Sequence, residues 1–98
     1  MSNTIALEQG IEKIIRARPG QTIPFFFEKG DKKYMGRAQV VSKSIEGGHS
    51  GETPNYHVNI FDVTDGGGVR LSRLKEKAFA RTAEDLQQQL FTIFNGLK

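Results

Sequence analysis

Residues 21–44 read QTIPFFFEKGDKKYMGRAQVVSKS, and this stretch decides the fold class. Its first part, residues 21–28, contains three consecutive phenylalanines, and bulky aromatic runs favour a β-strand. Residues 29–32 have the composition of a turn. Residues 33–44 then alternate between two faces as a second strand does, so the stretch predicts a β-hairpin.

Pro24 gives the first strand of this hairpin its place in the sheet. Proline has no N–H to donate to a strand ladder, so this strand lies at an edge or begins there. Because successive residues of a strand point to opposite faces, Phe25, Phe26 and Phe27 cannot all face the core. The outward face of this strand is therefore covered by a helix, by a partner or by nothing.

Two further strands are predicted downstream. Residues 55–64 alternate as a third strand, after a loop at residues 46–54. The turn from Asp65 to Gly68 (DGGG) needs positive φ angles, and the chain returns from Val69 as a fourth strand. Residues 70–81 also fit a helical period, which leaves a helix from about Ser72 as an alternative. We prefer a strand that continues irregularly to Phe79, because Thr82 has the features of a helix N-cap.

Helical periodicity marks both ends of the chain. The first apolar stripe predicts a helix from about Thr4 to Arg18 and consists of Leu7, Ile11, Ile14 and Ile15. Gly10 lies inside this helix and is expected to weaken it by about 1 kcal/mol relative to alanine. The second stripe follows Thr82 and consists of Leu86, Leu90, Ile93, Phe94 and Leu97. Gly96 is the predicted C-cap of that helix.

These elements predict one α+β domain over residues 1–98, in the order α-β-β-β-β-α. A chain of 98 residues can bury one small core. The most economical packing is an antiparallel four-stranded sheet with the N-terminal and C-terminal helices packed on one face. The other face of the sheet is then wholly or partly open to solvent.

Composition excludes several classes of protein. The chain has no cysteine, which removes disulfide scaffolds, thiolate zinc sites and cysteine nucleophiles. Residues 1–5 lack the basic flank and apolar core of a signal peptide, and no apolar run is long enough to span a bilayer. We therefore expect a cytoplasmic protein with no membrane contact. No pattern specifies an oligomeric state.

No motif predicts catalysis, a cofactor or a metal. The glycine-rich segments at 47–51 and 65–68 lack the Lys-Ser or Lys-Thr of a phosphate loop, and neither precedes a helix. His49 and His57 are not spaced as metal ligands. Ser50 is adjacent to His49 and cannot form a nucleophile–base pair with it. The sequence therefore predicts a non-enzymatic protein without a cofactor.

Charge distribution is the clearest functional signal. The net charge is +3, but residues 29–43 and residues 70–81 each hold five bases and one acid, whereas the remainder holds four bases and nine acids. Two basic segments in an acidic remainder indicate a polyanionic partner. A solvated surface that is rich in lysine is the alternative interpretation.

Strand pairing would gather polar side chains on the open sheet face. That face is expected to hold Arg37, Gln39, Lys43, His57, Asn59 and Phe61, with Arg70 beside them. Cations, amide donors and an aromatic ring suit phosphates and unpaired bases. The alternative is a polar solvent face with Phe61 under a loop. The aromatic signature of RNA-recognition sheets is absent.

The sequence predicts a non-catalytic binding module for a nucleic acid or a nucleic-acid–protein complex. The second hypothesis is an inhibitor or adaptor encoded by a phage or mobile element. Such a protein would bind a host defence ribonucleoprotein complex and block its nucleic-acid site, and a small enzyme ranks last. The candidate binding residues are Lys29, Lys32, Lys33, Arg37, Lys43, His57, Asn59, Phe61, Arg70, Arg73, Lys75, Lys77 and Arg81.

Overall fold

A computed structural model describes residues 4–43, 53–66 and 73–97 of the chain. Helix α1 (Ile5–Arg16) leads into four strands, and helix α2 (Ala83–Gly96) follows them. The strands are β1 (Thr22–Lys29), β2 (Lys32–Lys43), β3 (Thr53–Asp62) and β4 (Leu74–Ala80). They pair antiparallel in the order β1-β2-β3-β4. The predicted α-β-β-β-β-α order is confirmed, and β4 confirms the strand that we preferred over a helix.

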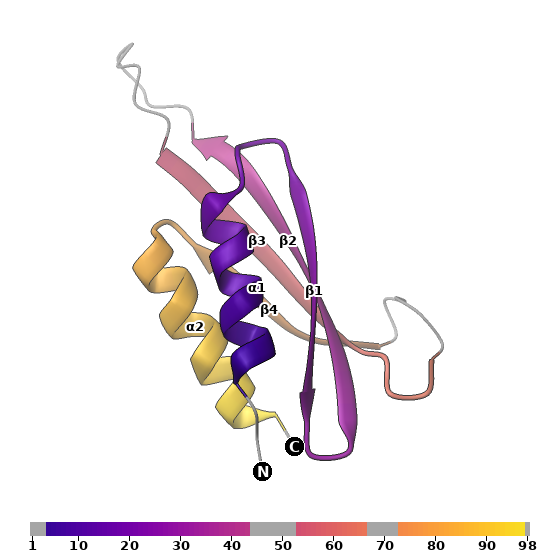
Figure 1. The fold of residues 1–98 in the computed structure, drawn as a ribbon. Helices are drawn as coiled ribbons and strands as arrows, with labels where there is room; N and C mark the ends of the chain where they lie inside the picture. Colours follow the sequence, from indigo (N-terminus) through magenta and orange to yellow (C-terminus); the bar gives the residue numbers. More distant parts are fainter. Residues whose placement is uncertain (1–3, 44–52, 67–72, 98) are drawn as a thin grey trace.

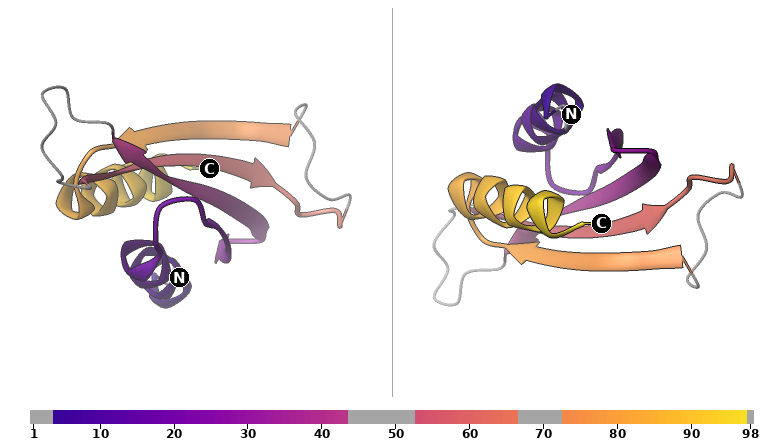
Figure 2. Two further views of the ribbon diagram at one scale, coloured as in Figure 1. Left: turned by 90° about the horizontal axis from the view of Figure 1, so that it is seen from above. Right: turned by 90° about the horizontal axis from the view of Figure 1, so that it is seen from below.

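Both helices lie on the same side of the sheet, as Figures 1 and 2 show. The apolar stripes of the helices meet the inward side chains of the strands to form one core, except that Ile15, which was predicted in the first stripe, is 40% exposed. The core side chains are Leu7, Ile11 and Ile14 of α1, Leu86, Leu90 and Phe94 of α2, and Phe25, Phe27, Tyr34, Ala38, Val40, Tyr56, Val58, Ile60, Ala78 and Ala80 of the sheet. The predicted packing of both helices on one face is therefore confirmed.

The ends of α2 agree only in part with the sequence. Thr82 caps the N-terminus as predicted, because its hydroxyl accepts a hydrogen bond from the backbone N–H of Asp85 at 3.0 Å. The prediction of Gly96 as C-cap is wrong. The helix continues through Gly96, and Leu97 is the C-cap with a φ of −72°. A left-handed residue is unnecessary here because Lys29 of β1 binds the last carbonyls of the helix.

Two glycines make room for the ring of Phe25. A Cβ atom on Gly10 of α1 would lie 2.8 Å from the Cβ of Phe25, and one on Gly36 of β2 would lie 2.1 Å from its Cζ. Phe25 and Gly36 are register partners across β1 and β2. Gly10 is therefore more than a weak point of a helix, because it allows α1 to approach β1 closely.

The turn after β3 confirms another prediction. Gly66 has a φ of +76°, a conformation that glycine adopts without strain. Residues 67–72, which include the other two glycines of this turn, lie outside the described part of the chain.

Candidate functional site

The sheet face that points away from the helices, here called the open face, includes three rows that cross all four strands. The first row is Thr22, Gln39, His57 and Phe79; the second is Pro24, Arg37, Asn59 and Lys77; the third is Phe26, Met35, Phe61 and Leu74. Register partners on one face have Cβ atoms about 4.5–5.5 Å apart. The open face thus has a cationic and polar row between two rows that contain aromatic rings.

Exposed cations lie on the open face. Arg37 and Lys77 flank Asn59 in the second row, and both are exposed. Lys33 is also exposed, farther along β2 and opposite Glu28. Among the described residues, none of these three cations forms an ion pair with a carboxylate. Their charge is therefore available to an anionic partner.

Exposed aromatic rings lie at two corners of the open face. Phe26 on edge strand β1 is 62% exposed, and Phe79 on edge strand β4 is 42% exposed. The ring of Phe79 contacts His57, with centroids 4.7 Å apart, and the guanidinium of Arg81 lies 5.9 Å from its centroid. Sequence reasoning did not select either phenylalanine. The alternation of β1 contained the signal for Phe26, because its neighbours Phe25 and Phe27 are core residues.

Phe61 does lie on the open face, as predicted, but its ring is only 5% exposed. Its register partners are Met35 on β2 and Leu74 on β4. A ring buried to this extent has no free face on which a base could stack. We therefore omit Phe61 from the candidate surface.

Lys29 has a role that the sequence did not indicate. Its Nζ donates hydrogen bonds to the carbonyl of Phe94 at 2.6 Å and to that of Asn95 at 3.0 Å, and lies 5.2 Å from the centroid of the Phe94 ring. No basic residue lies in the last turn of α2, so this lysine supplies the cation at the negative end of the helix dipole. Lys29 thus stabilises the fold and does not belong to the open face.

Replacing Lys29 tests this structural role. We expect Lys29→Met to lower the free energy of unfolding by about 1–2 kcal/mol, because it removes a cation from a partly buried helix C-terminus. Urea denaturation measures the effect. Lys33→Met is the matched control, and it should change stability by no more than about 0.5 kcal/mol because Lys33 is exposed. Equal effects of the two substitutions would contradict the capping role.

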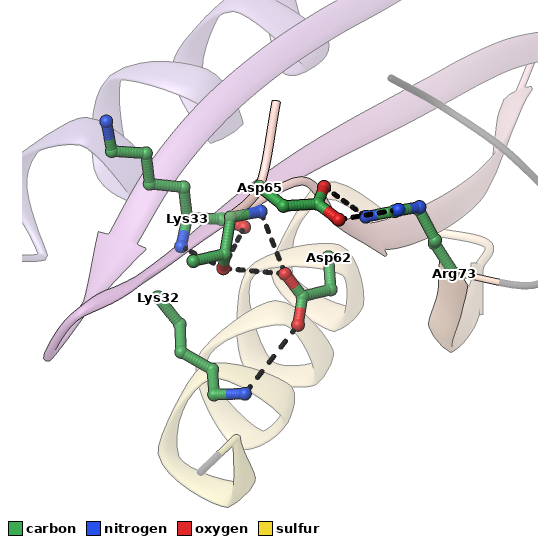
Figure 3. A network of polar contacts seen from close by, with 6 residues as sticks. Lys32, Lys33, Asp62, Asp65 and Arg73 are labelled. Carbon is green, nitrogen blue, oxygen red and sulfur yellow. Dashed lines mark hydrogen bonds and ion pairs between the residues drawn. The ribbon is translucent and has the colours of Figure 1, made fainter. Parts of the chain in front are cut away.

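Lys32 and Lys75 lie near the carboxylate of Asp62 at the end of β3. Figure 3 shows Lys32 beside this carboxylate. Thr64 donates to Asp62 Oδ1 from its hydroxyl at 2.6 Å and from its backbone N–H at 2.9 Å. These hydrogen bonds hold the pKa of Asp62 below its usual value, and the positive charges of Lys32 and Lys75 add to the effect. The Nζ of Lys32 lies 3.8 Å from Asp62 Oδ2. The positive charges of both lysines therefore partly compensate the negative charge of Asp62, which belongs to the protein itself.

Arg73 is similarly paired. It donates from both terminal nitrogens to the carboxylate of Asp65, and the Nη2–Oδ2 distance is 2.7 Å (Figure 3). Bidentate pairs of this kind are strong and directional. The side chain of Lys43 and the whole of Arg70 lie outside the described part of the chain. Of the thirteen predicted site residues, the structure thus brings together Arg37, His57, Asn59 and Lys77, with Lys33 and Arg81 at the margins.

Other kinds of site find no support in the described ranges. Within residues 4–43, 53–66 and 73–97, no group of three histidine, aspartate or glutamate side chains could hold a metal ion. Neither α1 nor α2 has the length and apolar character needed to cross a membrane. No protein-family model, curated protein sequence or solved structure matches this chain.

Proposed function

We propose that this chain is a non-catalytic module that binds a nucleic acid, alone or within a nucleic-acid–protein complex, through the open face of its sheet. One observation carries the proposal. The second row presents Arg37 and Lys77 without a carboxylate partner among the described residues, and exposed Phe26 and Phe79 lie in the rows on either side. Phosphates bind such cations, and the faces of bases bind such rings.

The ion pairs separate the bases that have a partner within the protein from those that remain available. Among the bases of the two basic segments, Lys32 and Arg73 pair with carboxylates and Lys29 caps α2. The count of five bases in each segment therefore overstates the number of cations available to a partner. Within the described parts of these two segments, Lys33, Arg37, Lys77 and Arg81 remain available and lie on or beside one face, which is the arrangement that a polyanion needs.

A protein partner on the same face is the second candidate. This is the inhibitor or adaptor hypothesis, in which the chain blocks a nucleic-acid site on a host defence complex. The observation that favours it is Phe26, a large apolar side chain that is 62% exposed on an edge strand. A hollow of about 350 Å³ beside it extends from the open face to the helix side of the sheet, because its lining includes Phe26 and Lys33 together with Ala6 of α1 and the core residue Phe27.

Charge reversal with a salt titration tests the proposal. Each phosphate contact contributes about 0.9 on duplex DNA, and about 0.7 on a single strand, to the magnitude of the slope of log K against log salt concentration. We expect Arg37→Glu with Lys77→Glu to weaken binding to labelled oligonucleotides and to flatten this slope by about 1.4 on a single strand or about 1.8 on duplex DNA. The measurement is fluorescence anisotropy at several salt concentrations, with RNA and DNA in single-stranded and duplex form.

A matched variant controls for net charge. Lys13→Glu with Arg18→Glu alters the total charge by the same amount, at exposed positions on and just after α1. It should leave most of the affinity and the salt slope intact. Equal losses in both double variants would mean that binding follows net charge and not the open face. If no oligonucleotide binds, while a protein from nuclease-treated lysate binds and is lost in Phe26→Ala, the protein candidate replaces the proposal.

A further inference from the structure

A hollow on the open face extends across β2, β3 and β4, which are consecutive strands of the sheet. Its volume is about 510 Å³, and its lining includes Gln39, Val41, His57, Asn59, Lys77 and Phe79. These side chains come from the first and second rows of the open face and from the adjoining part of β2. The hollow therefore combines an aromatic pair, two amides and a cation.

The aromatic part of the hollow is a platform. The rings of His57 and Phe79 are 4.7 Å apart between centroids and inclined by 58°, so each restricts the orientation of the other. Phe79 remains 42% exposed at the edge of the sheet. Arg81, with its guanidinium 5.9 Å from the Phe79 centroid, adds a cation beside the ring. An aromatic ring flanked by arginine suits stacking of a base next to a phosphate.

The polar part of the hollow can recognise the edge of a base. Gln39 and Asn59 are exposed, and within the described chain their amides have no hydrogen-bond partner in the protein. Each amide offers a donor and an acceptor, which matches the paired groups on a base edge. Lys77, the register partner of Asn59, adds a donor for a phosphate.

The second exposed ring extends this arrangement across the sheet. Phe79 lies in the row of His57, and Phe26 lies in the row of Phe61. These two rows are four residues apart along β3, which corresponds to about 13 Å. Strands β1 and β4 are three strand spacings apart, or about 14 Å. The two rings are therefore roughly 20 Å apart on the diagonal. The cationic second row crosses the space between them.

We propose that the hollow at His57 and Phe79 binds one unpaired nucleobase of a single-stranded nucleic acid. From this base the strand continues over Arg37 toward Phe26. The inference rests on the proposed function and names its ligand class. In a duplex the base faces are stacked and the Watson–Crick edges are paired, so neither the platform nor the amides could engage them. Phe79 stacks the base, Gln39 and Asn59 bind its edge, and the cations bind phosphates.

Substitution of Phe79 in the full chain tests the subsite. We expect single-stranded RNA or DNA to bind more tightly than a duplex of the same sequence. Phe79→Leu should weaken single-strand binding by about 5- to 150-fold, the range that corresponds to loss of one base–aromatic stack. Phe79→Trp should keep the affinity, and the fluorescence of its indole should be quenched when the single strand binds. Parallel titrations with RNA and DNA identify which sugar the site accepts.

Ile15→Ala is the control, because Ile15 is 40% exposed on the helix side of the molecule, and it should leave affinity unchanged. If Phe79→Leu binds single strands as the parent does while the Arg37 and Lys77 reversal abolishes binding, the subsite is refuted and the proposed function stands. The same conclusion follows if the Phe79→Trp indole is not quenched. If no oligonucleotide binds at all, both proposals fail.

Discussion

Phe25→Ala is expected to lower the free energy of unfolding by about 3–5 kcal/mol. The ring is 4% exposed and lies against Gly10 and Gly36, with its centroid 6.0 Å from that of Phe27. Because two of its neighbours have no side chain that could move into the space, the cavity left by the ring cannot collapse easily. Urea denaturation measures the loss, and the same-strand control Phe26→Ala should stay within about 0.5 kcal/mol because Phe26 is exposed.

A double-mutant cycle shows whether the ring occupies the space above Gly36. Gly36→Ala alone should cost about 1–3 kcal/mol, because its new methyl group would overlap the ring. In the Phe25→Ala background that overlap is gone, and the cost of Gly36→Ala should nearly vanish. Strict additivity of the two changes would contradict the packing described for Phe25.

Leu90→Ala is the second large effect, with an expected loss of about 2–5 kcal/mol. Leu90 is completely buried in the middle of α2 and packs in the core between that helix and the sheet. For a domain of this size the loss corresponds to a fall of roughly 8–40 °C in the thermal midpoint. Circular dichroism measures the midpoint.

The control for Leu90 lies on the opposite side of the same helix. Gln88 is exposed, so Gln88→Ala should move the midpoint by only a few degrees. An unchanged midpoint in Leu90→Ala would mean that α2 does not depend on its contact with the sheet.

The elements of the fold were predictable because each has a strong local pattern. The aromatic run after Pro24 predicted β1, the alternation of residues 33–44 predicted β2, and the cap at Thr82 favoured a strand before the last helix, as β4 confirms. The end of α2 was not predictable. Its last carbonyls bind Lys29, which is 65 residues from Phe94 in sequence, and no local pattern contains that contact.

The candidate surface was predictable in outline only. Alternation placed Arg37, His57 and Asn59 on one face, and the register of β2 with β3 confirms that they are close. The aromatic residues were not predicted correctly, because exposure depends on what covers each ring. Phe61 is buried and Phe79 is exposed, although both lie on strands with mixed polar and apolar composition.

The strand order has a consequence for how the chain folds during synthesis. Every strand pairs with the next one along the chain, so the β1–β2 hairpin can close as soon as Lys43 has been made. Phe25 can then pack against Gly10 of α1, which is already made, but Phe27 must wait for the Phe94 ring and Lys29 for the Phe94 carbonyl. At about 5–20 residues per second, synthesis from Lys43 to Phe94 takes roughly 3–10 seconds. For those seconds α1 is the only helix that can cover the nascent hairpin, and the apolar side chains that α2 later covers are then most exposed to chaperones and to aggregation.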